Sequence, residues 1–247
     1  MLDARLSRYS TEPKQLNNHA ENRLLAALTR KDFRLLLPDL ETVALPLNEI
    51  LCRCGDVIRY VYFPVDSVIS LLSEVEEDRS TLEIGVVGNE GMAGIAVFLG
   101  VKKSRNRMIV QGAGTALRMK AAALRGHSNG GGRLQSLLQL YTHALLTQVS
   151  QSAACNRFHL VEARLARWLL AMRDRIGSNE FQLTQEFLSN MLGVRREMVN
   201  KAAGTLQKQG LISYTRGILT ILDNAGLETA TCACYRSIKE EYDNFLD

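Results

Sequence analysis

Residues 183–212, LTQEFLSNMLGVRREMVNKAAGTLQKQGLI, decide the fold, because they predict two helices joined by a tight turn at Gly193. Thr184 can cap the first helix, and Glu186 lies in its first turn, where the helix dipole favours negative charge. The second helix is expected over residues 194–209 and should close at Gly210, a residue type that commonly ends helices. This pattern is typical of a helix-turn-helix, so DNA is the expected partner.

The second of these helices has two faces of different chemistry. Apolar side chains at helical spacing can pack on the first helix, namely Val199, Ala202, Ala203 and Leu206. On the other face, arginine can pair with guanine, glutamate with the cytosine amino group and asparagine with adenine. The expected DNA-binding residues are therefore Thr184, Gln185, Arg195, Arg196, Glu197, Asn200, Lys201, Lys208 and Arg216. The alternative is a solvated charged face on an ordinary pair of core helices.

A hairpin is expected directly after the second helix. Residues 211–214 and 218–222 are short apolar runs joined by Thr215, Arg216 and Gly217. Such a hairpin makes the module winged, and Arg216 at its tip could contact a phosphate. The alternative for Arg216 is an ordinary exposed arginine in a turn.

Length and composition fit a two-domain protein. The chain has 247 residues, of which 46% are hydrophobic, and a formal net charge of +4. The charge is only mildly positive, so DNA binding must come from the local excess of basic residues between 158 and 217. No window is long and apolar enough for a membrane span, and residues 1–30 do not resemble a signal peptide, so a cytoplasmic protein is expected.

The five cysteines are expected to be free thiols, with no metal site. They include two Cys-x-Cys pairs, Cys52 with Cys54 and Cys232 with Cys234, which are too far apart in the chain to form a zinc motif. The alternative is that the two pairs meet around a metal or sense oxidants.

The expected fold class is α+β, in four segments. Residues 1–40 form an arm and short helices, and residues 41–125 contain short strands separated by turns, which predict a small antiparallel barrel or sandwich. Residues 126–157 contain a glycine-rich joint up to Gly132 and a long helix from about Arg133 to Cys155. Residues 158–247 form the winged helix-turn-helix domain, entered through a helix over residues 159–176.

The long helix carries side chains at heptad spacing. This spacing predicts a seam that pairs two copies of the helix across a dimer axis. The alternative is that the stripe packs on its own barrel. The seam consists of Leu134, Leu138, Tyr141, Leu145, Gln148 and Ser152.

The order of barrel, long helix and winged helix-turn-helix resembles the Crp/Fnr family of bacterial transcription regulators, over about residues 40–225. The sharpest likeness is at residues 192–199, LGVRREMV, which is similar to the family's Gly-x-Ser-Arg-Glu-x-Val segment. The resemblance implies an N-terminal jelly-roll of the cyclic-nucleotide-binding type, a homodimer, and RNA polymerase as a further partner. It also implies base reading by Arg196 and Glu197, although Arg195 stands where members usually have serine and Lys201 where many have arginine.

The resemblance is weaker in the effector pocket. Nucleotide-binding members have a cassette that opens with Gly-Glu and closes with Arg-Ser, whereas this chain has Gly94-Ile95 and Arg105-Asn106. Ser150 falls near the position that touches the purine in such members. Each lost polar partner should cost about 1–3 kcal/mol, which argues against cyclic AMP. The expected effector is therefore another small molecule or none, and Arg105 could equally be a solvated charge.

The sequence thus predicts a homodimeric regulator that binds a palindromic DNA operator. An alternative is a ligand-binding sensor or scaffold whose helix-turn-helix contacts proteins. An enzyme is not expected, because the four histidines lie in unrelated segments and no catalytic constellation surrounds them.

Overall fold

The computed structural model describes residues 21–74 and 81–245. Residues 1–20, expected to form an arm, lie outside this range. Two short helices, α1 (Arg23–Ala26) and α2 (Arg30–Leu36), open the described chain. Thr29 caps α2, since its hydroxyl accepts a hydrogen bond from the Asp32 amide at 3.1 Å. Pro38 lies in the 3₁₀ turn η2 (Leu37–Asp39) that follows.

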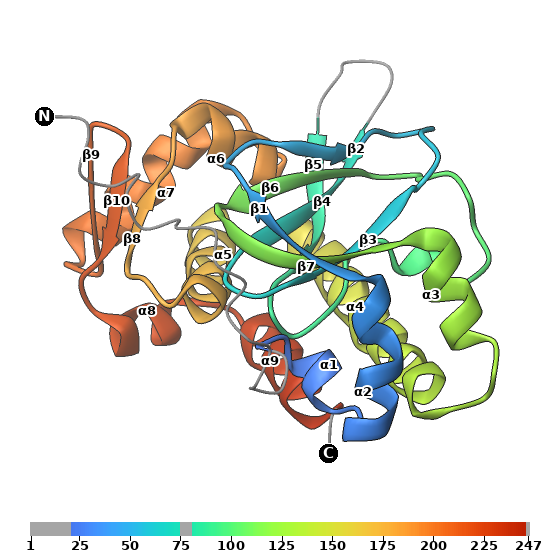
Figure 1. The fold of residues 1–247 in the computed structure, drawn as a ribbon. Coiled ribbons are helices and arrows are strands. Elements are labelled where there is room, and N and C mark those ends of the chain that lie inside the picture. The colour runs from blue at the N-terminus through green and yellow to red at the C-terminus, as the bar shows by residue number, and fades with distance from the viewer. Residues whose placement is uncertain (1–20, 75–80, 246–247) are drawn as a thin grey trace, which may run out of the picture.

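The barrel consists of two antiparallel sheets, as the short strand-like runs predicted (Figure 1). Side chains from both sheets share one hydrophobic core. One sheet has the order β1-β7-β3 and the other the order β2-β6-β4-β5. The strands are β1 (Leu40–Leu45), β2 (Ile50–Cys52), β3 (Tyr60–Pro64), β4 (Val68–Glu74), β5 (Thr81–Val87), β6 (Arg107–Gly112) and β7 (Gly114–Lys120), with the 3₁₀ turn η3 (Ile95–Val97) between β5 and β6.

Two long helices connect the barrel to the rest of the molecule. The helix α4 (Arg133–Phe158) runs three residues beyond the predicted end, and α5 (Val161–Ile176) follows it. The predicted glycine-rich joint is shorter than expected, because α3 (Ala121–Ser128) includes Gly126 and the two residues after it. A single glycine within a helix is tolerated, at a cost of about 1 kcal/mol.

The winged module packs around a second core, to which α5 and the barrel residues Val68, Leu72 and Val86 also contribute. Its helices are α6 (Gln185–Leu192), α7 (Arg196–Lys208) and α8 (Asn224–Ala230). Its sheet has the order β8-β10-β9, built from β8 (Glu180–Gln182), β9 (Ile212–Thr215) and β10 (Ile218–Ile221). The hairpin of β9 and β10 confirms the predicted wing, whereas β8 was not anticipated.

The last helix, α9 (Cys234–Asn244), leaves the winged module and packs on α4 (Figure 1). Ile238, Tyr242 and Phe245 belong to the core of the barrel. The ring of Tyr141 on α4 lies 6.4 Å from that of Tyr242 and 6.0 Å from that of Phe245, measured between centroids. The end of the described chain therefore completes the barrel core with aromatic packing.

Candidate nucleic-acid interface

The turn between α6 and α7 is built as the sequence predicts. The Thr184 hydroxyl accepts from the Phe187 amide at 3.0 Å, and Gly193 ends α6 with a φ of 60°. A Cβ atom at Gly193 would lie 2.7 Å from Cδ1 of Leu82 on β5. The left-handed backbone favours glycine at this position, and a larger residue would also have to displace the end of the Leu82 side chain.

One face of helix α7 packs on α5 and α6, and the opposite face is exposed. Val199, Ala202, Ala203 and Leu206 are buried against α5 and α6, as predicted. The helix begins at Arg196 rather than at residue 194, because Arg195 is its extended N-cap residue. The opposite face of α7 is exposed, so its N-terminal side chains are available to a groove of DNA.

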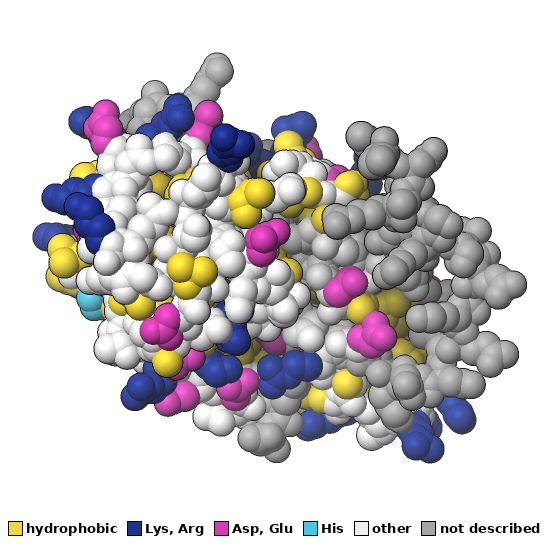
Figure 2. All heavy atoms as spheres, turned by 90° about the vertical axis from the view of Figure 1, so that its left-hand side faces the viewer, with side chains coloured by type: hydrophobic (Ala, Val, Ile, Leu, Met, Phe, Trp, Pro, Cys, Tyr) yellow, Lys and Arg dark blue, Asp and Glu magenta, His cyan; other side chains and the backbone are white. Residues whose placement is uncertain are grey.

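The nine predicted DNA-binding residues lie on the surface of the winged module. Eight of them are exposed, and Gln185 is partly buried, with its amide donating a hydrogen bond to Oδ1 of Asn200. Four members of the set surround one concavity between the start of α6, the start of α7 and the wing, together with Tyr214 and Gly217. These four are Thr184, Gln185, Arg196 and Arg216. Figure 2 faces this end of the molecule, where Lys and Arg side chains gather along the margins among a few acidic ones.

Tyr214 is a member of this surface that sequence reasoning missed. Its hydroxyl donates to the Leu183 carbonyl at 2.9 Å and so ties β9 to the segment before α6. Arg216 and Gly217 form the tip of the wing, with φ values of 53° and 80°. The only sequence signal for Tyr214 was its place in an apolar run next to the turn.

The predicted dimer seam is turned inward. All six residues, Leu134, Leu138, Tyr141, Leu145, Gln148 and Ser152, are buried within the protomer. Hydrogen bonds of Gln148 hold this face of α4 against the barrel. Its side-chain oxygen accepts from the Val86 amide on β5 at 2.7 Å, and its side-chain nitrogen donates to the Val86 carbonyl at 3.3 Å. The heptad stripe of α4 therefore covers its own barrel, which was the alternative, while Leu146 faces outward and is 62% exposed.

The five predicted effector residues do not gather around a common cavity with α4. Gly94 has a φ of 96°, and Ile95 packs against the barrel core. Arg105 and Ser150 are exposed. None of these residues, nor Asn106, lines the cavity that the structure places between the barrel and the helices.

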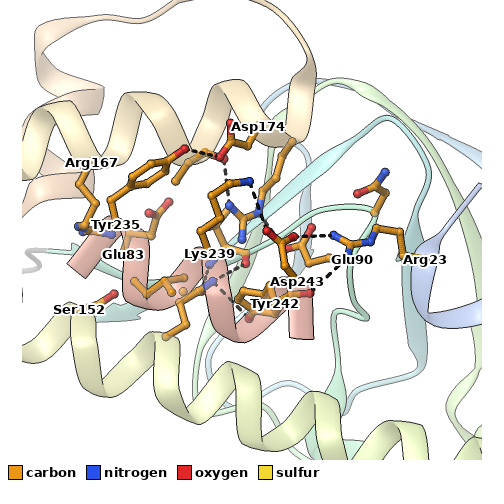
Figure 3. Close-up of a pocket in the computed structure, with 17 residues that line it drawn as sticks. Arg23, Glu83, Glu90, Ser152, Arg167, Asp174, Tyr235, Lys239, Tyr242 and Asp243 are labelled. Carbon is orange, nitrogen blue, oxygen red and sulfur yellow. Dashed lines mark hydrogen bonds and ion pairs between the residues drawn. The ribbon is translucent and has the colours of Figure 1, made fainter. Parts of the chain in front are cut away.

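That cavity has a volume of about 120 Å³ and lies among β5, α4, α5 and α9 (Figure 3). Its walls carry the buried ion pair of Arg175 Nε and Glu90 Oε1, at 2.8 Å. Glu90 Oε1 also accepts from the Gly88 amide at 3.1 Å. Ligand pockets for drug-sized molecules usually measure about 300–1,000 Å³, so this cavity is too small for a nucleotide.

A second acid of the cavity, Glu83, titrates near neutral pH. Burial raises the pKa of Glu83 to about 7, although a hydrogen bond from Ser70 at 2.7 Å and the nearby Arg167 and Arg175 lower it. In Figure 3, Glu83 lies toward the Arg167 end of the cavity. These charged groups connect α5 to the barrel, and no local pattern in the sequence predicted that they would meet.

One group of metal-ligating side chains was also missed. The ligand atoms of Cys155, His159, Cys232 and Cys234 all lie within 4.8 Å of one another, and these residues are called the Cys₃His cluster. The pKa of the Cys232 thiol is lowered to about 5, chiefly by the hydrogen bond from Cys155. The alternative that the two Cys-x-Cys pairs meet is wrong, because Cys54 instead contacts the Arg105 carbonyl at 3.3 Å.

Comparison with solved structures shows a shared fold over most of the chain. FixK2 from Bradyrhizobium japonicum has a TM-score of 0.66 and 15% identity, with 78% of this chain and 98% of that chain covered. The c-di-GMP responsive global regulator CLP from Xanthomonas campestris has a TM-score of 0.65 and 16% identity, with 79% and 100% covered. A protein from Eubacterium rectale described as a regulator of the crp/fnr family has a TM-score of 0.64 and 18% identity, with 84% and 96% covered.

Residues 163–230, which include α6, α7 and the wing, match the family model of the Crp-like helix-turn-helix domain. These residues therefore form a Crp-like helix-turn-helix domain, and the chain as a whole shares its fold with these solved structures. A comparison with curated protein sequences gives no match. Within residues 21–74 and 81–245, no helix combines the length and apolar character that crossing a membrane requires.

Proposed function

We propose that this protein is a transcription regulator of the Crp/Fnr type, which binds DNA as a homodimer and reads an imperfect palindrome through Arg196 and Glu197. The observation that carries the proposal is the concavity that gathers Thr184, Arg196 and Arg216 beside the free face of α7. Arginine at the start of a recognition helix can reach guanine in the major groove. An arginine at the wing tip can reach the backbone phosphate alongside.

The outward face of α4 supports the dimer. This helix of 26 residues contains no Asp, Glu or Lys, which is unusual for a surface helix. Depletion of charge is typical of the core of a protein interface. The exposed face follows the spacing of four and three residues that lie on one side of a helix. Its members are Gln139, His143, Leu146, Ser150, Ala153 and Arg157.

A two-fold axis along this face would present two copies of α7 on successive major grooves. The two half-sites would then be separated by about 34 Å, one turn of the double helix. A regulator of this kind would act on RNA polymerase in the cytoplasm, and transcription with purified polymerase tests that step.

The same proposal holds that the barrel does not bind cyclic AMP. Ile95 offers no carboxylate for a ribose hydroxyl, and Arg105 is exposed on the surface of the barrel. Tyr242 and Phe245 fill the space between the barrel and α4 with aromatic rings. A thermal-shift titration with cyclic AMP should therefore leave the melting temperature unchanged, whereas a ligand at 100 times its Kd would add about 2.7 kcal/mol.

Selection from randomised DNA tests the operator directly. We expect a palindrome, and steep loss of affinity between low and high salt as phosphate contacts are screened. Arg196→Ala and Glu197→Ala should lose discrimination at particular base pairs, by about 1–3 kcal/mol each. Lys208→Ala should weaken all sequences equally, and Arg236→Ala on α9 serves as the control that changes neither. Recovery of no palindrome, with no salt-dependent binding, would refute the proposal in favour of a protein-binding helix-turn-helix.

A further inference from the structure

The distances within the Cys₃His cluster match those around a single tetrahedral ion. Sγ of Cys155 lies 3.5 Å from Sγ of Cys232, and Sγ of Cys234 lies 3.6 Å from Nδ1 of His159. With Zn–S bonds of about 2.3 Å and Zn–N bonds of about 2.0 Å, tetrahedral geometry separates two sulfurs by about 3.8 Å and a sulfur from a nitrogen by about 3.5 Å. Two of the donor–donor distances thus match those around one ion, and all four donor atoms lie within 4.8 Å of one another.

The backbone of two segments supplies this arrangement. Cys155 and His159 are four residues apart at the C-terminal end of α4, so their side chains lie on the same side of the helix. The His159 amide donates to the Cys155 carbonyl at 3.1 Å, which fixes the turn between them. Cys232 precedes α9 and Cys234 is its first helical residue, so the start of α9 brings both thiols to the end of α4.

We propose that the Cys₃His cluster binds one Zn²⁺ ion, which fastens the start of α9 to the end of α4. Three cysteines with one histidine form a recognised set for structural zinc, in which the protein supplies all four ligands. Three thiolates around a divalent ion leave one net negative charge. Arg164, which is 6% exposed, and Arg167 interact electrostatically with the cluster and can offset that charge.

Two other uses of these thiols fit the geometry less well. A cubane iron–sulfur cluster takes four cysteines and binds each to a different iron, which spreads the ligands beyond the reach of one ion. A disulfide between Cys155 and Cys232 would need their sulfurs to approach from 3.5 Å to about 2.05 Å, and it would leave Cys234 and His159 without a role.

The proposed zinc site lies at the junction of α4, α5 and α9, so a bound ion would affect how these helices pack together. It lies where α4 ends and α5 begins, at the entry to the winged module, and it anchors the segment that carries Tyr242 into the barrel core. Bound zinc would therefore stabilise the docking of α9 and, through it, the placement of the winged module relative to the barrel. Because metal binding contributes directly to folding free energy, the ion should raise the melting temperature.

The test begins with the whole wild-type protein purified under reducing conditions. Elemental analysis should find one zinc per chain. A chelator should remove it and lower the melting temperature by about 5–10 °C, and added Zn²⁺ should restore both. Co²⁺ added to the stripped protein should give the strong visible absorption of a tetrahedral thiolate site. This sequence of measurements needs no substitution and so remains valid if a variant fails to fold.

Variants then assign the ligands. Cys232→Ser and His159→Ala should weaken zinc binding by more than about 100-fold, and the matched Cys54→Ser, an exposed thiol outside the cluster, should leave it unchanged. The proposal is overturned if the reduced wild-type protein neither retains zinc nor binds Co²⁺, if Cys54→Ser has the same effect as Cys232→Ser, or if the protein isolated without oxygen contains a disulfide between Cys155 and Cys232.

Discussion

Replacing Glu83 by glutamine should make the protein more stable above neutral pH. Glu83 lies between the barrel and α5, and burial raises its pKa from the ordinary 4.5 to about 7. The folded state therefore binds this proton more tightly than the unfolded chain, and stability must fall as pH rises from about 4.5 to 7. At about 1.4 kcal/mol per pH unit, the wild-type protein loses about 3 kcal/mol over that range through this one group.

Glutamine resembles the protonated carboxyl group and can still accept from Ser70, but it cannot ionise. Glu83→Gln should thus match the wild type near pH 5 and exceed its free energy of unfolding by about 1–3 kcal/mol at pH 8. Urea unfolding at several pH values measures both curves, and their difference removes the contribution of every other titrating group.

Glu228→Gln on the exposed surface of α8 is the matched control, and its curve should run parallel to that of the wild type. If Glu83→Gln also runs parallel to the wild type across pH 5–8, then Glu83 is charged and solvated in the folded protein and the reasoning from burial is wrong.

Two further predictions concern packing and charge. Gly193→Ala should destabilise the protein by about 1–2 kcal/mol, because the backbone of this residue is left-handed. Gly204→Ala within α7 meets open space and should stabilise the protein by up to about 1 kcal/mol. Thermal unfolding should therefore show opposite shifts for the two variants. Glu90→Gln should destabilise the protein by about 3 kcal/mol or more, because it leaves Arg175 buried without its countercharge. The control is Glu41→Gln at an exposed ion pair, which should change stability by less than about 1 kcal/mol. Equal effects at the two glutamates in urea unfolding would contradict that comparison.

The parts of the fold that depend on local signals could be predicted from the sequence. The cap at Thr184, the left-handed Gly193 and the turn at Gly217 each act within a few residues, and the structure has all three. The strands of the barrel followed from short apolar runs between turn residues for the same reason. Local chemistry therefore predicted the helix-turn-helix, the wing and the class of the barrel.

What depends on distant partners could not be predicted. A heptad stripe shows that one face of a helix is apolar but not what covers it, so Gln148 was assigned to a dimer seam although it pairs with the backbone of β5. The Cys₃His cluster joins Cys155 to Cys232, which are separated by the whole winged module. The ion pair of Glu90 and Arg175 likewise connects the barrel to α5, and no sequence motif near either residue predicts this pairing.

The place of α9 has a consequence for the order of assembly during synthesis. The winged module leaves the ribosome before residues 234–244, whereas the barrel, whose strands are made much earlier, lacks part of its core until those residues arrive. Domains generally fold as units in the order in which they are made. In this chain the barrel, although synthesised before the winged module, would complete its core after that module has folded, when Ile238, Tyr242 and Phe245 are added.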